Sequence, residues 1–241
     1  MNRVAPATEL LRIETLRQNQ LGRLPLYLLI CLIGCSQTAA PPGLFPYQAR
    51  GWNKIPIVVV LGQESDPRNQ LVRDAVEFWN NQLAQLGSGF RLGPVRLIDQ
   101  TVPAREIETL RRAIDEGKRA LVGPPSGFIQ IEGDLIIALS DAAFISFAMS
   151  FQKTDKRLIA ISSFQRAPLR FTNVGRNLIA HELGHGIGLG HNNDPSKLMC
   201  GRPAACRPGE FRSHVEHFFP LMEEEKKVLL KLYPPTWREA H

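Results

Sequence analysis

The protein has 241 residues, of which 44% are hydrophobic and 22% are charged, and this composition excludes a collagen, a coiled coil and a fully disordered chain. The net charge of +6 is carried without a basic run or a basic–aromatic motif, so we expect no nucleic acid partner. No apolar run reaches the roughly 18 residues that a membrane-spanning helix requires.

Residues 1–34 are predicted to be a signal peptide. An uncharged apolar stretch at residues 24–34 follows two arginines, and it has the length and the flanks of a signal-peptide core. The stretch runs into the letters LIGC, which end at Cys35 and resemble the lipobox of bacterial lipoproteins. The alternative is a buried helix that ends in an incidental cysteine.

The lipobox resemblance implies a diacylglycerol group on the thiol of Cys35. Residues 35–49 are rich in proline and small residues, and we expect them to tether a domain to the membrane. By resemblance to known sorting rules, Ser36 favours the outer membrane in an organism that has one. The expected location is therefore the bacterial cell envelope, with the membrane as a partner through the lipid anchor.

Strands and helices are predicted along residues 50–241. β-branched runs bounded by turn residues predict strands, and apolar residues at helical spacing predict helices. The predicted strands cover residues 55–62, 90–98, 134–139 and 157–162, and the predicted helices cover 66–86, 103–116, 174–187 and part of 210–233. This order indicates an α+β or α/β fold in one domain.

The sequence HELGHGIGLGH, which begins at His181, contains the candidate metal ligands and a candidate catalytic base. On a helix, His181 and His185 lie one turn apart on the same face, and two neutral imidazoles suit Zn²⁺. Glu182 is beside them as a candidate base for a water molecule. A turn at Gly188, where glycine tolerates a positive φ, would bring His191 back as a third ligand.

Three histidine ligands leave a fourth position for water, which is the arrangement of a catalytic rather than a structural zinc. With this chain's own composition, the fixed positions of the motif would match by chance at an expectation on the order of 10⁻⁵. The alternative is three histidines that are satisfied in the core or at the surface.

Residues 180–191 resemble the zinc-binding stretch of the metzincin metalloproteases, and they are most similar to the matrixin (matrix metalloprotease) branch. Met199 follows at a spacing similar to that of the matrixin Met-turn, and residues 221–233 resemble the last matrixin helix. The resemblance implies one catalytic domain of α+β fold at residues 50–241. It also implies a twisted, mostly parallel sheet, an active-site helix and a C-terminal helix.

The same resemblance implies one catalytic zinc ion and a protein or peptide substrate. Glu182 would act as general base, and the substrate would lie extended along an edge strand. Residues 134–139 are our choice for that strand, and residues 202–219 are expected to form a wall of the substrate site. Structural calcium is common in matrixins, but no loop rich in Asp and Asn supports it here.

Two pairs of residues after the motif are open to more than one interpretation. Cys200 and Cys206 could form a disulfide, which export would permit, or could stay two free thiols. Because Cys200 and Gly201 follow Met199, no tyrosine helper of the kind that some metzincin branches carry there is assigned. His214 and His217 could share a metal, but no third ligand is evident, so we expect solvated loop residues.

The sequence therefore predicts a lipid-anchored zinc endopeptidase. Two other functions stay open. One is a non-catalytic envelope lipoprotein that keeps the zinc for binding or scaffolding, against which the intact Glu182 argues. The other is a hydrolase of a non-peptide amide on the same zinc site.

Overall fold

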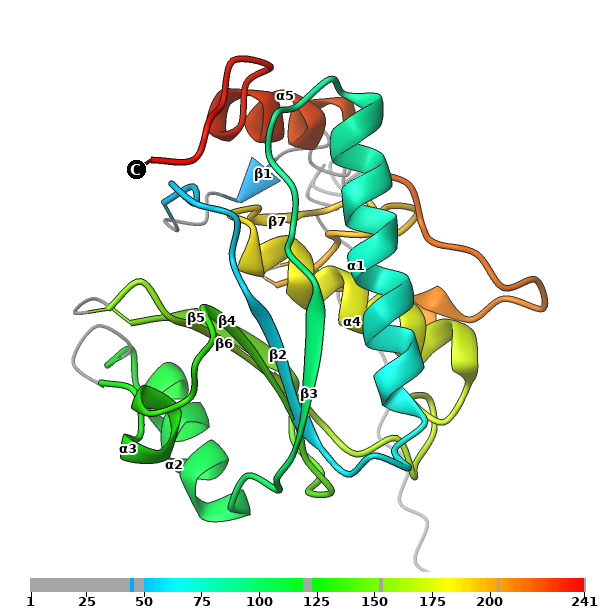
Figure 1. The fold of residues 1–241 in the computed structure, drawn as a ribbon. Helices are drawn as coiled ribbons and strands as arrows, with labels where there is room; N and C mark the ends of the chain where they lie inside the picture. Colours follow the sequence, from blue (N-terminus) through cyan, green and yellow to red (C-terminus); the bar gives the residue numbers. More distant parts are fainter. Residues whose placement is uncertain (1–43, 46–49, 119–122, 152–153, 203, 241) are drawn as a thin grey trace, which may run out of the picture. The chain divides into compact units, whose positions relative to one another are not determined.

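The computed structural model describes residues 44–45, 50–118, 123–151, 154–202 and 204–240 (Figure 1). The chain divides into two compact units, residues 1–39 and 40–241, and every described residue belongs to the second. Cys35 and the predicted signal peptide lie outside the described residues. Within the described ranges, no helix is long and apolar enough to span a membrane.

A five-stranded sheet forms the centre of the domain (Figure 1). Its strands lie in the order β3-β2-β4-β6-β5, and all neighbours are parallel except β5, which runs antiparallel to β6. The strands are β2 (Val58–Gly62), β3 (Val95–Asp99), β4 (Leu135–Leu139), β5 (Phe147–Ser150) and β6 (Arg157–Ile161). The mixed fold with a mostly parallel sheet confirms the predicted class.

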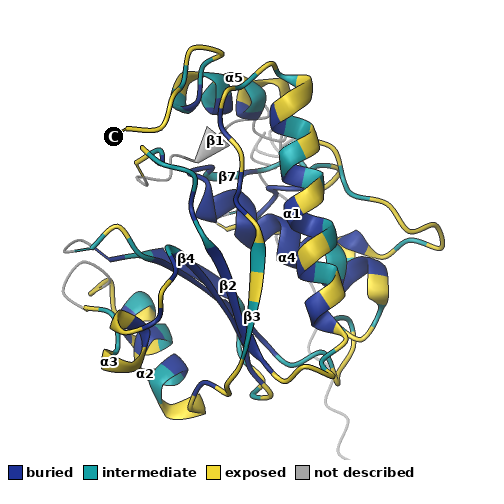
Figure 2. Cartoon of the chain, in the orientation of Figure 1, coloured by how far each residue is buried: buried dark blue, intermediate teal, exposed yellow. Residues whose placement is uncertain are grey.

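Strands β2, β4 and β6 are buried along their whole length, because helices cover both faces of the sheet (Figure 2). Alternate residues of each strand therefore enter two separate apolar clusters. In β2, for example, Val58 and Val60 pack on one side, while Val59 and Leu61 pack on the other. This two-sided burial explains why the strands read as continuous apolar runs in the sequence.

Helices α1 (Arg68–Gln85) and α4 (Thr172–Gly186) pack on one face of the sheet, and α2 (Ala104–Asp115) and α3 (Ser126–Ile129) pack on the other (Figure 1). Helix α5 (Glu223–Leu232) follows near the end of the chain.

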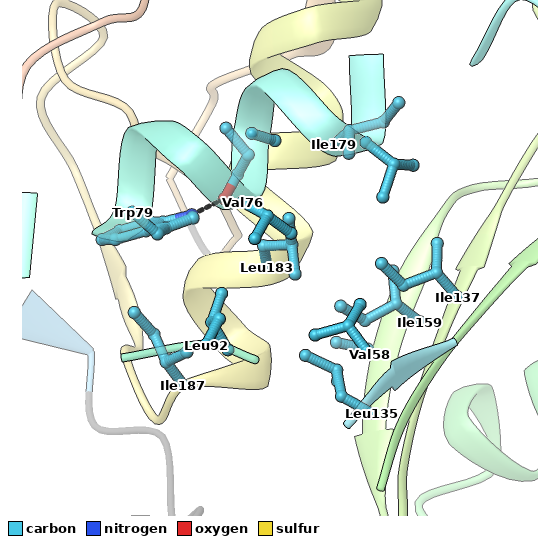
Figure 3. Packing of buried hydrophobic residues seen from close by; sticks show 14 of the residues in the cluster. Val58, Val76, Trp79, Leu92, Leu135, Ile137, Ile159, Ile179, Leu183 and Ile187 are labelled. Atoms are coloured by element: carbon cyan, nitrogen blue, oxygen red, sulfur yellow. Dashed lines mark hydrogen bonds between the residues drawn. The ribbon is translucent and has the colours of Figure 1, made fainter. Parts of the chain in front are cut away.

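Packing between α1 and α4 fixes the position of α4 (Figure 3). The indole of Trp79 is fully buried and donates a hydrogen bond of 2.8 Å from Nε1 to the carbonyl of Ala180. Ile179 and Leu183 of α4 lie in the same cluster as Ile137 and Ile159 of the sheet. The helix with the predicted zinc motif is thus held by both its helical neighbour and the sheet.

The prediction that residues 134–139 form an edge strand is wrong. They form β4, which lies between β2 and β6, so neither edge of β4 is available to another chain. The edges of the sheet are β3 and β5. Strand β5 was missed because its four residues are too few to show a periodicity.

The structure also shortens two predicted elements. The strand expected at residues 90–98 covers only Val95–Asp99, because Asn80 bonds the backbone of Leu92 through both its amide atoms. The helix expected within residues 210–233 is preceded by a separate 3₁₀ turn, Pro208–Phe211. A small antiparallel pair joins β1 (Leu44–Phe45) to β7 (His191–Asn192).

Candidate metal centre

Helix α4 carries the first two histidines of the motif. Nearly all its residues are buried, because α1 covers it on one side and the sheet on another. His181 and His185 are each 7% exposed and face each other with ring centroids 4.8 Å apart. The spacing of four residues therefore places two imidazoles together, as helix geometry requires.

A sharp turn ends α4 and returns the chain to the site. Gly188 has a φ of 106°, which L side chains rarely adopt, and its amide bonds the carbonyl of His185 at 3.0 Å. The amide of Leu189 also bonds back to the carbonyl of Gly184. The turn leads directly into β7, which begins with His191.

The three histidines converge on one point. One ligand atom from each of His181, His185 and His191 lies within 4.8 Å of the others, and these three residues form the single metal-capable group found among the described residues. The ring of His191 lies 4.5 Å from that of His185 and 5.2 Å from that of His181, between centroids.

Backbone carbonyls orient all three rings. The Nδ1 atoms of His181, His185 and His191 lie 2.7, 2.8 and 2.7 Å from the carbonyl oxygens of Leu198, Leu189 and Arg202. A carbonyl only accepts hydrogen bonds, so each Nδ1 carries a proton and each neutral ring keeps its lone pair on Nε2. This is the outer-shell arrangement that fixes histidine ligands in metal sites.

The resulting lone pairs explain why the site suits a cation. Nε2 of His185 and Nε2 of His191 are 2.9 Å apart. Two lone pairs at that distance repel each other unless a positive charge lies between or beside them. Three neutral imidazole nitrogens are a donor set that suits zinc, so the residues present fit the metal predicted from the sequence.

Burial keeps His181 in the form that binds metal. Desolvation lowers the pKa of His181 to about 4, and the interaction with His191 acts in the same direction, while the hydrogen bond to the carbonyl of Leu198 opposes it. His181 is therefore neutral at pH 7, as a ligand must be.

The Leu198–Met199 segment lies directly against the histidines. Met199 is fully buried, and its carbonyl accepts a hydrogen bond of 2.8 Å from the amide of Asn192, the residue after His191. The amide of Gly201 in turn bonds the carbonyl of Asn192 at 3.1 Å. The segment predicted as a Met-turn thus supports two of the three histidines.

Glu225 is a supporting residue that the sequence did not reveal. Its side chain is 1% exposed and accepts hydrogen bonds from Nδ2 of Asn192 at 2.6 Å and from the amide of Met222 at 2.8 Å. Burial raises the pKa of Glu225, against the effect of both bonds. Glu225 lies among three consecutive glutamates, so no sequence signal distinguishes the buried one.

The remaining predicted residues are near the site or apart from it. Glu182 follows His181 on α4 and is 5% exposed. Cys200 and Cys206 are joined in a disulfide, with Cα atoms 5.8 Å apart. His214 and His217 are both exposed and are not members of the metal-capable group.

Comparisons with known proteins give little beyond this geometry. No family model matches the sequence, and no curated protein does. Among solved structures, archaemetzincin from Methanopyrus kandleri is similar with 16% identity and a TM-score of 0.40 over 77% of this chain and 98% of that one. A chain in a structure of a chaperone–substrate complex is similar with 12% identity and a TM-score of 0.42, over 78% of this chain and 36% of that one. Neither likeness identifies a family, and the candidate site therefore rests on its own residues.

Proposed function

We propose that this protein is a zinc-dependent endopeptidase of the metzincin type. The observation that carries the proposal is the convergence of His181, His185 and His191, each with its Nδ1 bound to a backbone carbonyl. A structural zinc site closes with four protein ligands, whereas three ligands leave a position for a reactant. Glu182, next to the first ligand and buried, adds the acid–base group that such a site needs.

When bound, zinc supplies a Lewis acid that polarises a scissile carbonyl and acidifies a water molecule. A carboxylate oxygen of Glu182 would accept the proton of the attacking water. The same oxygen then donates the proton to the nitrogen of the leaving amine. The histidines stay neutral throughout, since each keeps its proton on Nδ1 and donates it in a hydrogen bond to the carbonyl oxygen of Leu198, Leu189 or Arg202.

Strand β5 is the edge along which we expect an extended substrate to bind. It is the edge strand that packs against α4, whereas β3, the other edge, packs against α1. A peptide strand added at this edge would form main-chain hydrogen bonds with β5. Pockets that bind the peptide's side chains would then determine specificity.

The experiment that tests the proposal is Glu182→Gln. Glutamine keeps the size of the side chain but cannot accept the proton at neutral pH, and the three histidines are untouched. We expect a folded protein with normal zinc content whose peptidase activity is lower by about 10²–10⁴-fold. The measurement is digestion of a peptide library, with and without a zinc chelator, together with metal analysis of both proteins.

A wild-type protein that is loaded with zinc and cleaves no peptide in the library would contradict the proposal. If Glu182→Gln also preserved the cellular role, the result would favour a scaffolding protein. Cleavage of small amides by the wild type alone would favour a non-peptide amidase. The chelator arm excludes a contaminating protease of another class.

The proposed location is the bacterial cell envelope, with the domain anchored through a lipid on Cys35 and the outer membrane favoured where one exists. The support is the LIGC pattern after an uncharged apolar stretch. Cys35→Ala removes the thiol that would be acylated, so we expect the protein to leave the membrane fraction or to stay unprocessed. Normal processing and unchanged membrane fractionation of this variant would refute the lipid anchor.

A further inference from the structure

The face of α4 that carries the two histidines continues toward the start of the helix as two asparagines. Asn173 and Asn177 precede His181 at the same spacing of four residues, so all four side chains follow one stripe. The two amides are 4% and 0% exposed, respectively. Nothing in the proposed chemistry uses them.

Both asparagines bond to one segment that is far away in the sequence. Nδ2 of Asn177 donates to the carbonyl of His217 at 2.8 Å, and its Oδ1 accepts from the amide of Phe219 at 2.8 Å. Nδ2 of Asn173 donates to the carbonyl of Phe211 at 2.8 Å, and its Oδ1 accepts from the amide of His217 at 2.9 Å. Each amide thus uses a donor and an acceptor, which also fixes its orientation.

Three of these four bonds reach residues 212–219, which form no helix or strand of their own, and the fourth reaches Phe211 at the end of the 3₁₀ turn. Arg176 of α4 adds an ion pair with Glu216, whose carboxylate side chain is 54% exposed, and such pairs contribute little. Its guanidinium also lies 5.7 Å from the centroid of the Phe218 ring. Phe218 adds an apolar contact by stacking on Phe78 of α1. Buried hydrogen bonds from the two asparagines are therefore the main directional restraint on this segment.

The restrained segment borders the metal centre. The ring of Phe211 lies 6.4 Å from that of His181, between centroids, and contacts the ring of Phe219 edge to face at 5.1 Å. The two phenylalanines thus flank the stretch that the asparagines hold. A shift of the segment would move aromatic side chains beside the first zinc ligand.

We propose that Asn173 and Asn177 are positioning residues that determine substrate specificity, by holding residues 211–219 as a fixed wall beside the metal centre. The inference rests on the proposed peptidase function for its effect on substrates, but the restraint itself is independent of catalysis. One face of α4 therefore both binds the metal and sets the place of the wall.

The test compares Asn177→Leu with Asn80→Leu. Leucine branches at Cγ as asparagine does, but it can neither donate nor accept a hydrogen bond. Asn80 is a matched control, since its amide makes the same pair of bonds to the carbonyl and amide of Leu92, which belongs to neither α4 nor the wall. Zinc content, hydrogen exchange and the cleavage profile of a peptide library are measured for each protein.

For Asn177→Leu we expect faster exchange at residues 212–219, unchanged zinc content and a broader cleavage profile. The kcat/KM of the best wild-type substrate should fall about tenfold, because misplacement of a binding wall weakens orientation. Asn80→Leu should keep the wild-type profile. Asn173→Leu, which removes the other two bonds, should reproduce the result if Asn177→Leu fails to fold.

Three results would overturn the inference. The first is a cleavage profile of Asn177→Leu that equals that of the wild type. The second is an equal change of profile in Asn80→Leu, because loss of stability alone would then explain it. The third is unchanged exchange at residues 212–219 in both α4 variants. If the wild type cleaves no peptide, the proposed peptidase function is wrong. The hydrogen-exchange measurement then still shows whether Asn173 and Asn177 restrain residues 211–219.

Discussion

The two histidines on α4 and the third histidine of the candidate site, on β7, are held in different ways. His181 and His185 are placed by the helix itself, since a spacing of four residues brings them to one face whatever surrounds them. His191 lies in a strand of two residues that has no such internal order. The first pair is a local feature, and the third ligand is a product of long-range contacts.

Those contacts come from two other parts of the chain, the segment from Met199 to Arg202 and helix α5. The carbonyl of Arg202 orients the ring of His191, the carbonyl of Met199 bonds the next amide, and Glu225 of α5 bonds the side chain of Asn192. The site is therefore complete only when α4, the Met199 segment and α5 are all in place. Zinc binding should therefore report on the folding of the C-terminal part of the domain.

The largest expected effect follows from removing the third ligand. We expect His191→Ala to lower zinc affinity by more than about 10²-fold, because even the loss of an outer-shell partner commonly costs 10–100-fold. The helical pair would remain, yet two imidazoles cannot replace three. Metal analysis and competition with a chelator of known affinity measure the change.

His214→Ala is the matched control, because His214 is exposed and outside the metal-capable group. Full zinc content in His191→Ala would show that this histidine is not a ligand. The difference between the local pair and the third ligand would then have no bearing on metal binding.

Acidification tests the burial of the helical pair. His181 has a pKa of about 4 in the folded protein against a usual value of 6.5. Between these values the unfolded chain binds more protons, so the free energy of unfolding falls as the pH falls from 6.5 to 4. We expect this group to contribute a loss of roughly 3 kcal/mol in the metal-free protein.

Denaturant unfolding of the metal-free protein at pH 7 and pH 4 measures this loss. His181→Gln, which cannot titrate, should lose less stability over the same interval, while His214→Gln should behave as the wild type does. Equal pH dependence in His181→Gln and wild type would contradict the assigned burial of the ligand.

A substitution at Gly201 should lower zinc affinity less than the loss of His191 does. A Cβ atom at this position would overlap the ring of His191 at Cδ2 and Nε2. We expect Gly201→Ala to displace His191 and to lower zinc affinity by about 10–100-fold, while His181 and His185 keep their geometry. Chelator competition measures the affinity.

Gly209→Ala serves as the control for Gly201→Ala, since a Cβ atom there has its nearest neighbours at ordinary contact distance, 4.0 Å away in Pro168. Wild-type zinc affinity in Gly201→Ala would mean that the His191 ring can move without cost. The third ligand would then be less firmly held than its contacts indicate.

Much of the fold was readable from the sequence because its signals are local. The apolar runs of β2, β4 and β6 predicted buried strands, and the spacing in α1 and α4 predicted helices that the structure confirms. The order of the strands was not readable. Pairing depends on contacts between distant residues, so β4 could be mistaken for an edge although it lies in the middle.

The candidate metal site likewise has features that local spacing sets and features that long-range contacts set. By itself the sequence determined the helical face of His181 and His185, the turn at Gly188 and the candidacy of His191, since these depend on spacing and on the backbone freedom of glycine. Long-range packing sets which carbonyls orient the rings of His181 and His191 and which residues hold His191, because these contacts join residues that are distant in the sequence.

The asparagines of α4 show the physical reason most clearly. Asn173 and Asn177 have an evident spacing in the sequence, but their partners lie about forty residues away, at the end of a 3₁₀ turn and in the irregular segment that follows it. An amide side chain bonds any backbone that folding brings to it. The packing of the whole domain determines which backbone segment the amide meets. No local pattern of residues predicts that segment.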